Sequence, residues 1–113
     1  MKRTQLGEFE EVVMLAVGIL FGEAYGVSIK KEIEARLSRS VSVGALQTAL
    51  KRLESKGYLK SAEGEGNAER AGRPRKYFTI TSYGKKALEA ARDARNAMWD
   101  DIPPIALDLK IQG

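Results

Sequence analysis

The sequence predicts a mainly α-helical fold with one small β-hairpin. Residues 42–56 place apolar side chains on one face of a helix and polar or cationic side chains on the other. Residues 70–81 (RAGRPRKYFTIT) join a basic stretch containing Gly and Pro to an alternating apolar pattern, which is typical of the tip and return strand of a hairpin. Such a helix followed by a basic hairpin is the arrangement of a winged helix-turn-helix, which indicates double-stranded DNA as the partner.

Positive charge is unevenly distributed along the chain. The 113 residues contain 19 Lys and Arg against 15 Asp and Glu, which gives a formal net charge of +4. Arg70, Arg73, Arg75 and Lys76 follow one another closely with no acid among them. A cationic cluster of this kind is typical of nucleic-acid binders, and a solubilising surface is the alternative interpretation.

The residue types that are missing exclude several classes of function. The chain has no Cys and no His, which excludes disulfides, thiol redox sensing, the usual zinc sites and catalysis by these side chains. No nucleophile–base pair, metal-ligand set or phosphate-binding glycine motif is present, so we expect neither an enzyme nor a cofactor. The apolar run 12–21 is too short to span a membrane, and Glu8, Glu10 and Glu11 interrupt any signal peptide. We therefore expect a cytoplasmic protein without membrane association.

The first predicted helix, residues 6–21, is apolar on two sides. Phe9, Val13, Ala16 and Leu20 fall on one side, and Met14, Val17 and Phe21 fall on another. One side can cover the core of the domain, and the other can meet a partner chain. Gly22 and Gly26 then end the helix. The candidates for a partner contact are Phe9, Met14, Val17 and Phe21.

The next two helices form the predicted helix-turn-helix. Residues 27–38 carry an apolar stripe, and residues 39–42 form the turn. Ser42 is a good N-cap for the helix over 42–56, because its hydroxyl can accept hydrogen bonds from first-turn amides. Gly57 ends that helix. The apolar face contains Val43, Leu46, Leu50 and Leu53, and the opposite face contains Gly44, Gln47, Thr48, Lys51 and Ser55.

The rest of the chain predicts a hairpin and a fourth helix. Residues 58–63 and 75–80 are the candidate strands, with Phe78 and Ile80 facing the core. Thr81 is the expected N-cap of a helix over 82–99, and Pro103–Pro104 prevents its continuation. The predicted organisation is a winged helix-turn-helix over 1–81, a C-terminal helix over 82–99 and an extended tail over 100–113.

Side chains on the polar face of the third helix can read bases. Gln47 suits adenine, Lys51 suits guanine or a phosphate, and Thr48 suits a thymine methyl group or a phosphate. Gly44 and Ala45 are small, so the start of the helix can approach DNA closely. A plain solvated face is the alternative interpretation.

The basic hairpin suits the phosphate backbone or a narrow minor groove. The planar guanidinium groups of Arg73 and Arg75 can make several hydrogen bonds at once. Phosphate contacts give affinity and register, whereas base contacts give specificity. We therefore expect affinity mainly from the cluster Arg70, Arg73, Arg75 and Lys76, and specificity mainly from Gln47, Thr48 and Lys51.

Trp99, the only tryptophan, lies at the end of the fourth helix, beside Met98 and at the edge of the helix's apolar stripe. It is either a packing residue in a helix–helix interface or the wall of a ligand cavity between two subunits. The small residues along the stripe, such as Ala91, permit close approach of another helix, with Leu88 at its edge. The acid pairs Glu10–Glu11 and Asp100–Asp101 lack the spacing of a metal or acid–base site and are interpreted as surface charge.

These segments together resemble the PadR family of bacterial winged-helix transcriptional regulators, in its short subclass with a single C-terminal helix. The resemblance runs from Leu6 to about Leu88. It rests on LGEFEE (6–11), AYGVSI (24–29), VSVGAL (41–46), LESKGYL (53–59) and YFTITSYG (77–84).

The resemblance implies a homodimeric repressor that binds an operator of two-fold symmetry. It also implies dimerisation through the C-terminal and N-terminal helices, with Leu88, Ala91, Met98 and Trp99 on the C-terminal one. An effector binds some members of the family, and Trp99 is similar in place to an aromatic ligand contact. Tyr25 is implied as a contact to backbone phosphate. Ser42, at the start of the reading helix, is a further candidate for DNA contact on the residues alone.

Two other functions fit the same sequence. The chain can be a small-molecule sensor whose pocket lies at a dimer interface near Trp99, with DNA release as the output. It can also be a winged helix used only for protein interactions, in which case it has no affinity for DNA at physiological salt.

Overall fold

The computed structural model describes residues 6–66 and 74–108. Four helices and one antiparallel hairpin follow in the predicted order, so the mainly helical winged-helix fold is confirmed. The elements are α1 (Glu8–Ile19), α2 (Gly26–Leu37), α3 (Val43–Ser55), β1 (Leu59–Gly66), β2 (Pro74–Ile80), α4 (Ser82–Asp101) and the short 3₁₀ helix η2 (Pro104–Leu107). No helix within this described part combines the length and hydropathy needed to cross a membrane.

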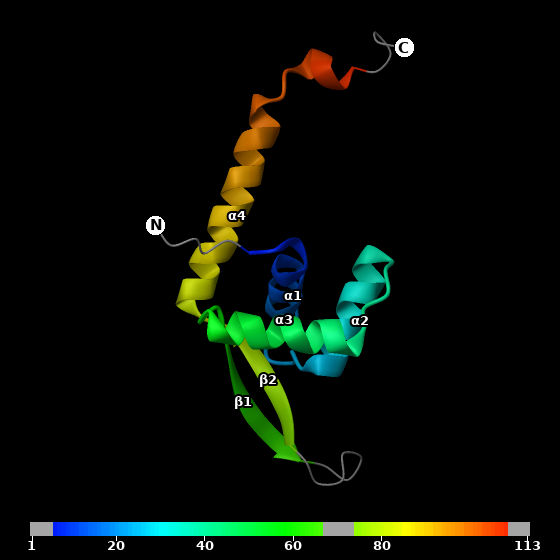
Figure 1. The fold of residues 1–113 in the computed structure, drawn as a ribbon, viewed down its shortest axis with the longest axis vertical. Helices are drawn as coiled ribbons and strands as arrows, with labels where there is room; N and C mark the ends of the chain where they lie inside the picture. Colours follow the sequence, from blue (N-terminus) through cyan, green and yellow to red (C-terminus); the bar gives the residue numbers. More distant parts are fainter. Residues whose placement is uncertain (1–5, 67–73, 109–113) are drawn as a thin grey trace.

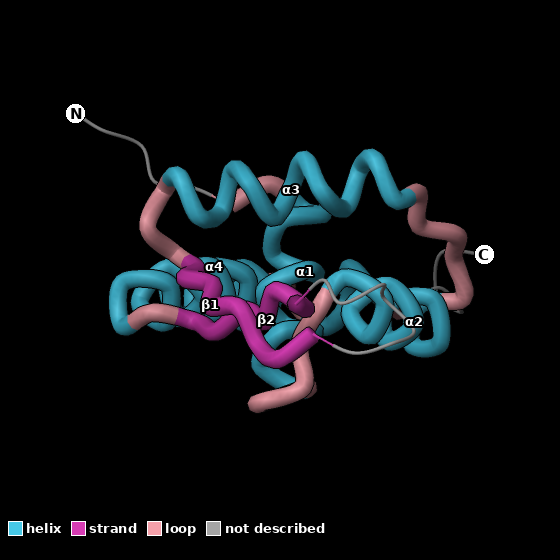
Figure 2. Tube along the Cα trace, turned by 90° about the horizontal axis from the view of Figure 1, so that it is seen from below, coloured by secondary structure: helices cyan, strands magenta, loops and turns pink. Residues whose placement is uncertain are grey.

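The first three helices surround a single apolar core. In Figure 1, α3 crosses α1 and α2, the hairpin extends to one side of α3, and α4 extends to the other. The view from below, in Figure 2, shows α3 as a separate layer over the hairpin and the remaining helices. The largest fully buried side chains come from these three helices and from Tyr58, just before β1: Val13, Met14, Ile29, Ile33, Leu46, Leu50, Leu53 and Tyr58.

Helix α1 is more deeply buried than the sequence suggests. Met14 is 0% exposed and Val17 is 2% exposed, and both belong to the chain's own core. Their predicted role in a partner contact is therefore wrong, because α2, α3 and the hairpin already cover that side of the helix. The apolar side chains that α1 leaves to solvent are Leu15 and Ile19, each about half exposed.

Two predicted caps are confirmed by hydrogen bonds. The Ser42 hydroxyl accepts from the Ala45 amide at 3.0 Å and starts α3. The Thr81 hydroxyl accepts from the Gly84 amide at 2.9 Å and also donates to the Gly57 carbonyl at 2.6 Å. Thr81 therefore joins the start of α4 to the chain that leaves α3.

The turn of the helix-turn-helix is fixed by one carboxylate. Glu34 of α2 accepts hydrogen bonds from the Val41 amide at 2.9 Å and from the Lys30 ammonium at 3.0 Å. These bonds, the Val41 bond first, hold the pKa of the Glu34 carboxyl below its ordinary value. Because Val41 immediately precedes the Ser42 cap, Glu34 helps to set the point at which α3 begins.

The hairpin is held to the helical core at its base. Leu59 pairs with Ile80, and the register continues until an irregularity between Glu63 and Gly66. Phe78 is buried as predicted, and its amide donates to the Ala24 carbonyl at 2.8 Å. This bond joins β2 to the loop between α1 and α2, so the base of the wing is part of the folded core.

Helix α4 packs on the rest of the chain mainly along its first half. Gly84 is buried against Tyr58, whereas residues 92–101 are exposed. The helix continues to Asp101, and η2 follows it after Pro103. The prediction of an extended tail from residue 100 is therefore wrong for residues 100–101 and 104–107, which are helical. A proline such as Pro104 is tolerated in the first turn of a helix, although it would interrupt the interior of one. Residues 109–113 lie outside the described part.

Candidate nucleic-acid interface

Helix α3 separates its side chains into a buried face and an exposed one. The leucines at positions 46, 50 and 53 are at most 2% exposed and anchor the helix on the core. The polar face opposite them is open to solvent over its whole length. It carries the side chains that the sequence singles out for DNA contact: Ser42, Gly44, Gln47, Thr48 and Lys51.

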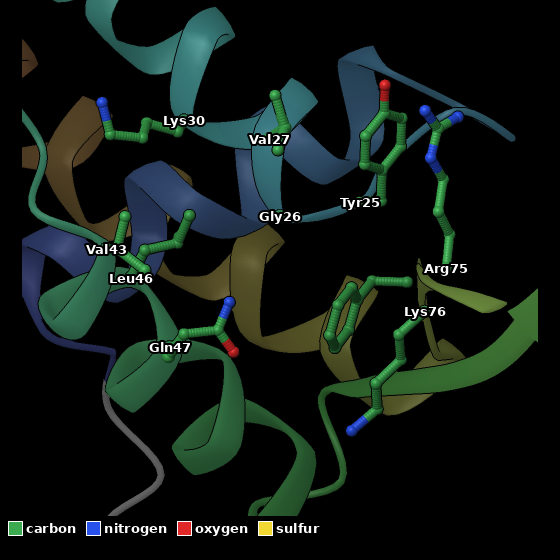
Figure 3. A pocket seen from close by; sticks show the side chains of 10 residues that line it. Tyr25, Gly26, Val27, Lys30, Val43, Leu46, Gln47, Arg75 and Lys76 are labelled. Carbon is green, nitrogen blue, oxygen red and sulfur yellow. The ribbon is translucent and has the colours of Figure 1, made fainter. Parts of the chain in front are cut away.

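A groove of about 330 Å³ joins three elements beside this face (Figure 3). It is formed by the start of α2, the first turns of α3 and strand β2. Gln47 borders it from α3, and a Cβ added to Gly26 would lie only 3.4 Å from the Gln47 Nε2 atom. The fold therefore brings Gln47, Tyr25 and Arg75 onto one surface, although they are far apart in the sequence.

Arg75 and Tyr25 form a stacked pair at the edge of the groove. The Arg75 guanidinium carbon lies 4.2 Å from the centre of the Tyr25 ring, a cation–π geometry. The Tyr25 ring also meets the ring of Tyr77 edge-on, with centroids 5.6 Å apart. Tyr25 thus contacts two residues of β2, and the face of its ring packs against the Arg75 guanidinium.

Lys76 lies on the same strand with a weaker tie. Its ammonium is 3.6 Å from a Glu54 carboxylate oxygen of α3, and its side chain is 57% exposed. Such an exposed pair contributes no more than about 1 kcal/mol, so Lys76 remains able to exchange Glu54 for a phosphate. Arg70 and Arg73, the other two cations of the predicted cluster, lie outside the described residues.

Two cations near this surface have no counterpart among the predicted contacts. Lys30 of α2 lines the groove beside Gln47, where it also pairs with Glu34. Arg52 is exposed one turn after Thr48, on the other flank of α3, and borders a concave surface formed with the start of α1. Arg52 could have been predicted as a residue of this surface, because it follows Thr48 by four residues on the same helix. Lys30 could not, because it reaches the groove only through the packing of α2 beside α3.

The acids of α1 differ from the surface charges that the sequence suggests. Glu11 is only 7% exposed, and its carboxylate lies 2.6 Å from the Arg95 guanidinium of α4. Glu10 accepts hydrogen bonds from Lys56 at 2.8 Å and from the Gly7 amide at 3.0 Å. Burial raises the pKa of Glu10, but these bonds and nearby cations outweigh it, so the pKa lies below its ordinary value. The surface-charge interpretation is therefore wrong for Glu11.

The remaining residues predicted for a partner contact are divided between buried and open positions. Phe9 is partly buried on the core with the Arg39 guanidinium 5.5 Å from its ring, and Leu88 and Ala91 are also partly buried. Phe21 is 87% exposed at the end of α1. Met98 and Trp99 are 72% and 65% exposed on the second half of α4.

Trp99 borders a second groove, between α1 and α4. This groove has a volume of about 490 Å³ and contains the Glu11–Arg95 pair, with Leu15 and Leu88 as apolar lining. It is separate from the polar face of α3. Across the described ranges, no group of three or more acidic side chains is arranged to hold a metal ion.

Known proteins of similar sequence and structure identify the family of this chain. A profile described as the transcriptional regulator PadR-like family matches residues 14–90. The chain belongs to the PadR-like family of transcriptional regulators. Transcription regulation by DNA binding is therefore the activity supported for this chain. No curated protein matches the chain.

Solved PadR-family structures resemble this PadR-like chain over most of its length. A PadR family transcription regulator from Clostridium difficile R20291 is 31% identical, with 81% of this chain and 92% of that chain covered and a TM-score of 0.63. One from Eggerthella lenta DSM 2243 is 26% identical, with coverages of 89% and 88% and a TM-score of 0.67. A PadR-like transcription factor from Bacteroides fragilis is 28% identical, with coverages of 84% and 89% and a TM-score of 0.64.

The PadR-like match covers α2, α3, the hairpin and the first half of α4. Every predicted DNA contact, from Tyr25 to Lys76, falls inside it. Met98 and Trp99 lie beyond it, on the part of α4 that is exposed. The predicted DNA contacts therefore lie within the segment that matches the family, whereas Met98 and Trp99 lie outside it.

Proposed function

We propose that this PadR-like regulator is a homodimeric repressor that reads a two-fold symmetric operator through α3. The observation that carries the proposal is the uninterrupted exposed row on α3, opposite a buried row of leucines. A helix whose one face is fixed on a core and whose other face is open and polar suits insertion into the major groove. The Tyr25–Arg75 pair and Lys76 flank that row, where the phosphate backbone would pass.

Within this proposal, the residues divide the work. Gln47, Thr48 and Lys51 contact base edges, with Gly44 leaving room for the approach. Arg73, Arg75 and Lys76 contact phosphates, together with Arg70, Ser42 and Tyr25. The exposed half of α4, with Met98 and Trp99, meets the same helix of a second copy, because an exposed apolar stretch of this size is typical of an interface.

The first experiment is a binding titration by fluorescence anisotropy. The chain is titrated into labelled DNA taken from upstream of its own gene and into scrambled DNA, over a series of salt concentrations. Tight, salt-dependent binding that prefers the native DNA is expected. Equal weak binding to both DNAs would show that the upstream DNA does not contain the operator, and absence of binding even at low salt would favour a protein-interaction role. Analytical ultracentrifugation of the same sample measures whether it is a dimer.

A ligand-responsive sensor is the second candidate, and the groove beside Trp99 favours it. Its volume of about 490 Å³ falls within the range of small-molecule sites, and it combines an indole ring and aliphatic side chains with the Glu11 carboxylate. Because Glu11 is paired with Arg95, and Lys85 and Arg92 also line the groove, hydrophobic aromatic compounds match this lining better than cationic ones. Quenching of the Trp99 fluorescence by such compounds, together with weakened DNA binding, is the expected result. An unchanged Trp99 signal across a broad set of them would refute a pocket at this place.

A further inference from the structure

Helix α4 is attached to the rest of the chain at two places, its first half, where Ala87 and Leu88 also pack partly on the core, and one point further along. The first place begins at its start, where Gly84 lies against Tyr58 and the Thr81 hydroxyl joins Gly57 to the first turn. The second is Arg95, three turns further along, whose guanidinium meets the Glu11 carboxylate of α1 at 2.6 Å. Beyond Arg95, the side chains of α4 are exposed.

Of the two partners in the ion pair, Glu11 is the one that depends on the other, because its side chain is buried. Within the described ranges, Glu11 is the one charged residue whose side chain is buried in the apolar part of the domain. A buried carboxylate that loses its cation keeps the cost of desolvation without the compensating attraction. Arg95 is 57% exposed and could point elsewhere, so the need for the pair comes from α1. Glu11 therefore favours those orientations of α4 that bring Arg95 within reach.

The length of α4 amplifies this constraint. A helix of 20 residues extends about 30 Å, so a rotation of roughly 10° about its start moves its far end by about 5 Å. Neighbouring base pairs are separated by about 3.4 Å along DNA. A change of this size in the direction of α4 is thus enough to misplace a recognition helix by more than one base pair.

We infer that Glu11 and Arg95 are positioning residues that set the direction of α4 relative to α3. In a dimer joined through α4, that direction fixes the separation of the two recognition helices, and so the spacing of half-sites that the protein accepts. This second step rests on the dimer proposed above. The pair touches no base or phosphate, so it acts on spacing without acting on the sequence of each half-site.

The direction of α4 can be measured without DNA. Since the natural chain has no Cys, Ser55→Cys and Ala97→Cys place one spin label at the end of α3 and one on α4, both at exposed positions. Double electron–electron resonance then gives the distribution of distances between the two labels. The labelled chain is diluted in unlabelled chain, so that only pairs of labels within one chain are seen. Arg95→Gln is expected to broaden or shift this distribution. Glu11→Gln, which removes the buried charge, is expected to change it in the same direction.

Arg92→Gln is the matched control, because Arg92 lies on the same helix and pairs only with its exposed neighbour Asp93 in the described part of the chain. It should leave the distribution as in the parent. A distribution in Arg95→Gln that is as narrow, and centred at the same distance, as in Arg92→Gln would overturn the inference. Circular dichroism shows whether each variant is folded.

Binding to a series of symmetric DNA sites tests the second step. The sites keep one half-site sequence and differ by single base pairs in the spacer. Arg95→Gln is expected to lose the preference for one spacer while keeping the preference for the half-site sequence, and Arg92→Gln is expected to keep both. An unchanged spacer preference would overturn the role in spacing. If the chain proves monomeric, the proposed function fails, and the distance measurement alone decides whether the pair orients α4.

Discussion

Gly84 and Tyr58 are in such close contact that no side chain fits between them. A Cβ at position 84 would lie 2.1 Å from the Tyr58 carbonyl oxygen and 3.0 Å from the Met14 Cε atom. Gly84→Ala should therefore push α4 away from the hairpin and lower the free energy of unfolding by about 1–3 kcal/mol or more. Urea denaturation followed by circular dichroism measures the loss.

Gly44→Ala is the matched control for that substitution. An added Cβ at Gly44 meets nothing within 4 Å, and the position lies in the first turn of α3. Stability should remain the same or rise by up to about 1 kcal/mol, because Ala is the better helix former. Equal losses in the two variants would show that contact with Tyr58 is not the cause.

Gln47→Ala should change the sequence preference of DNA binding. Gln47 is the one amide side chain of α3 and lies on its exposed face. Loss of one paired base contact is worth about 1–3 kcal/mol of discrimination between bases. Selection from a randomised DNA library is the measurement, with the parent chain selected in parallel. Identical preferred sequences from both chains would rule out Gln47 as a base-reading residue.

Arg73→Ala combined with Arg75→Ala should weaken binding to all DNA sequences alike. Two lost phosphate contacts reduce the slope of log K against log salt concentration by about 2. Anisotropy titrations on specific and scrambled DNA over a salt series measure both effects. Lys86→Ala combined with Arg92→Ala removes two exposed cations of α4 away from the groove beside α3, and so controls for the change in net charge. An unaltered slope would remove these arginines from the DNA interface.

The role of Tyr25 can be separated into its ring and its hydroxyl. Tyr25→Leu removes the ring under the Arg75 guanidinium and should cost about 0.5–2 kcal/mol of DNA affinity. Tyr25→Phe keeps the ring, so it should bind like the parent if support of Arg75 is what matters. Loss of affinity in Tyr25→Phe as great as in Tyr25→Leu would instead assign the effect to a direct hydroxyl contact.

Glu34→Gln should destabilise the chain at neutral pH, and the difference from the parent should vanish in acid. The pKa of Glu34 is lowered from 4.5 in the folded state, so its stabilisation is fully present above pH 4.5 and is lost as the pH falls through the folded pKa. Thermal unfolding at a series of pH values measures the difference. Glu32→Gln, on the same helix and paired with Arg36, should show a smaller effect. A pH-independent difference for Glu34→Gln would contradict a role for its charge.

Local pattern was sufficient for most of the fold. The hydroxyls of Ser42 and Thr81 can satisfy first-turn amides without help from distant residues, so both caps were predictable and both are confirmed. The two faces of α3 follow from helical periodicity in the same way. The exposed polar row, from Ser42 to Lys51, needed no knowledge of the other elements.

Apart from the 3₁₀ helix η2 in the predicted tail, the misses concern contacts between distant segments. Met14 and Val17 lie on a helix that is apolar nearly all round, so periodicity could not say which side is buried. Glu11 follows Glu10 in an acidic first turn and reads as surface until α4 brings Arg95 beside it. Tyr25 and Arg75 form a pair only because β2 returns next to the start of α2.

The double hydrogen bonding of Thr81 has a consequence for how the chain can be divided. One hydroxyl serves both the first turn of α4 and Gly57, two residues after the end of α3, and Gly84 in that same turn covers Tyr58 and Met14. A truncated chain ending at Thr81 would expose these core side chains to water. The smallest cooperative folding unit therefore includes the beginning of α4. We expect that residues 1–81, separated from α4, do not keep the native fold.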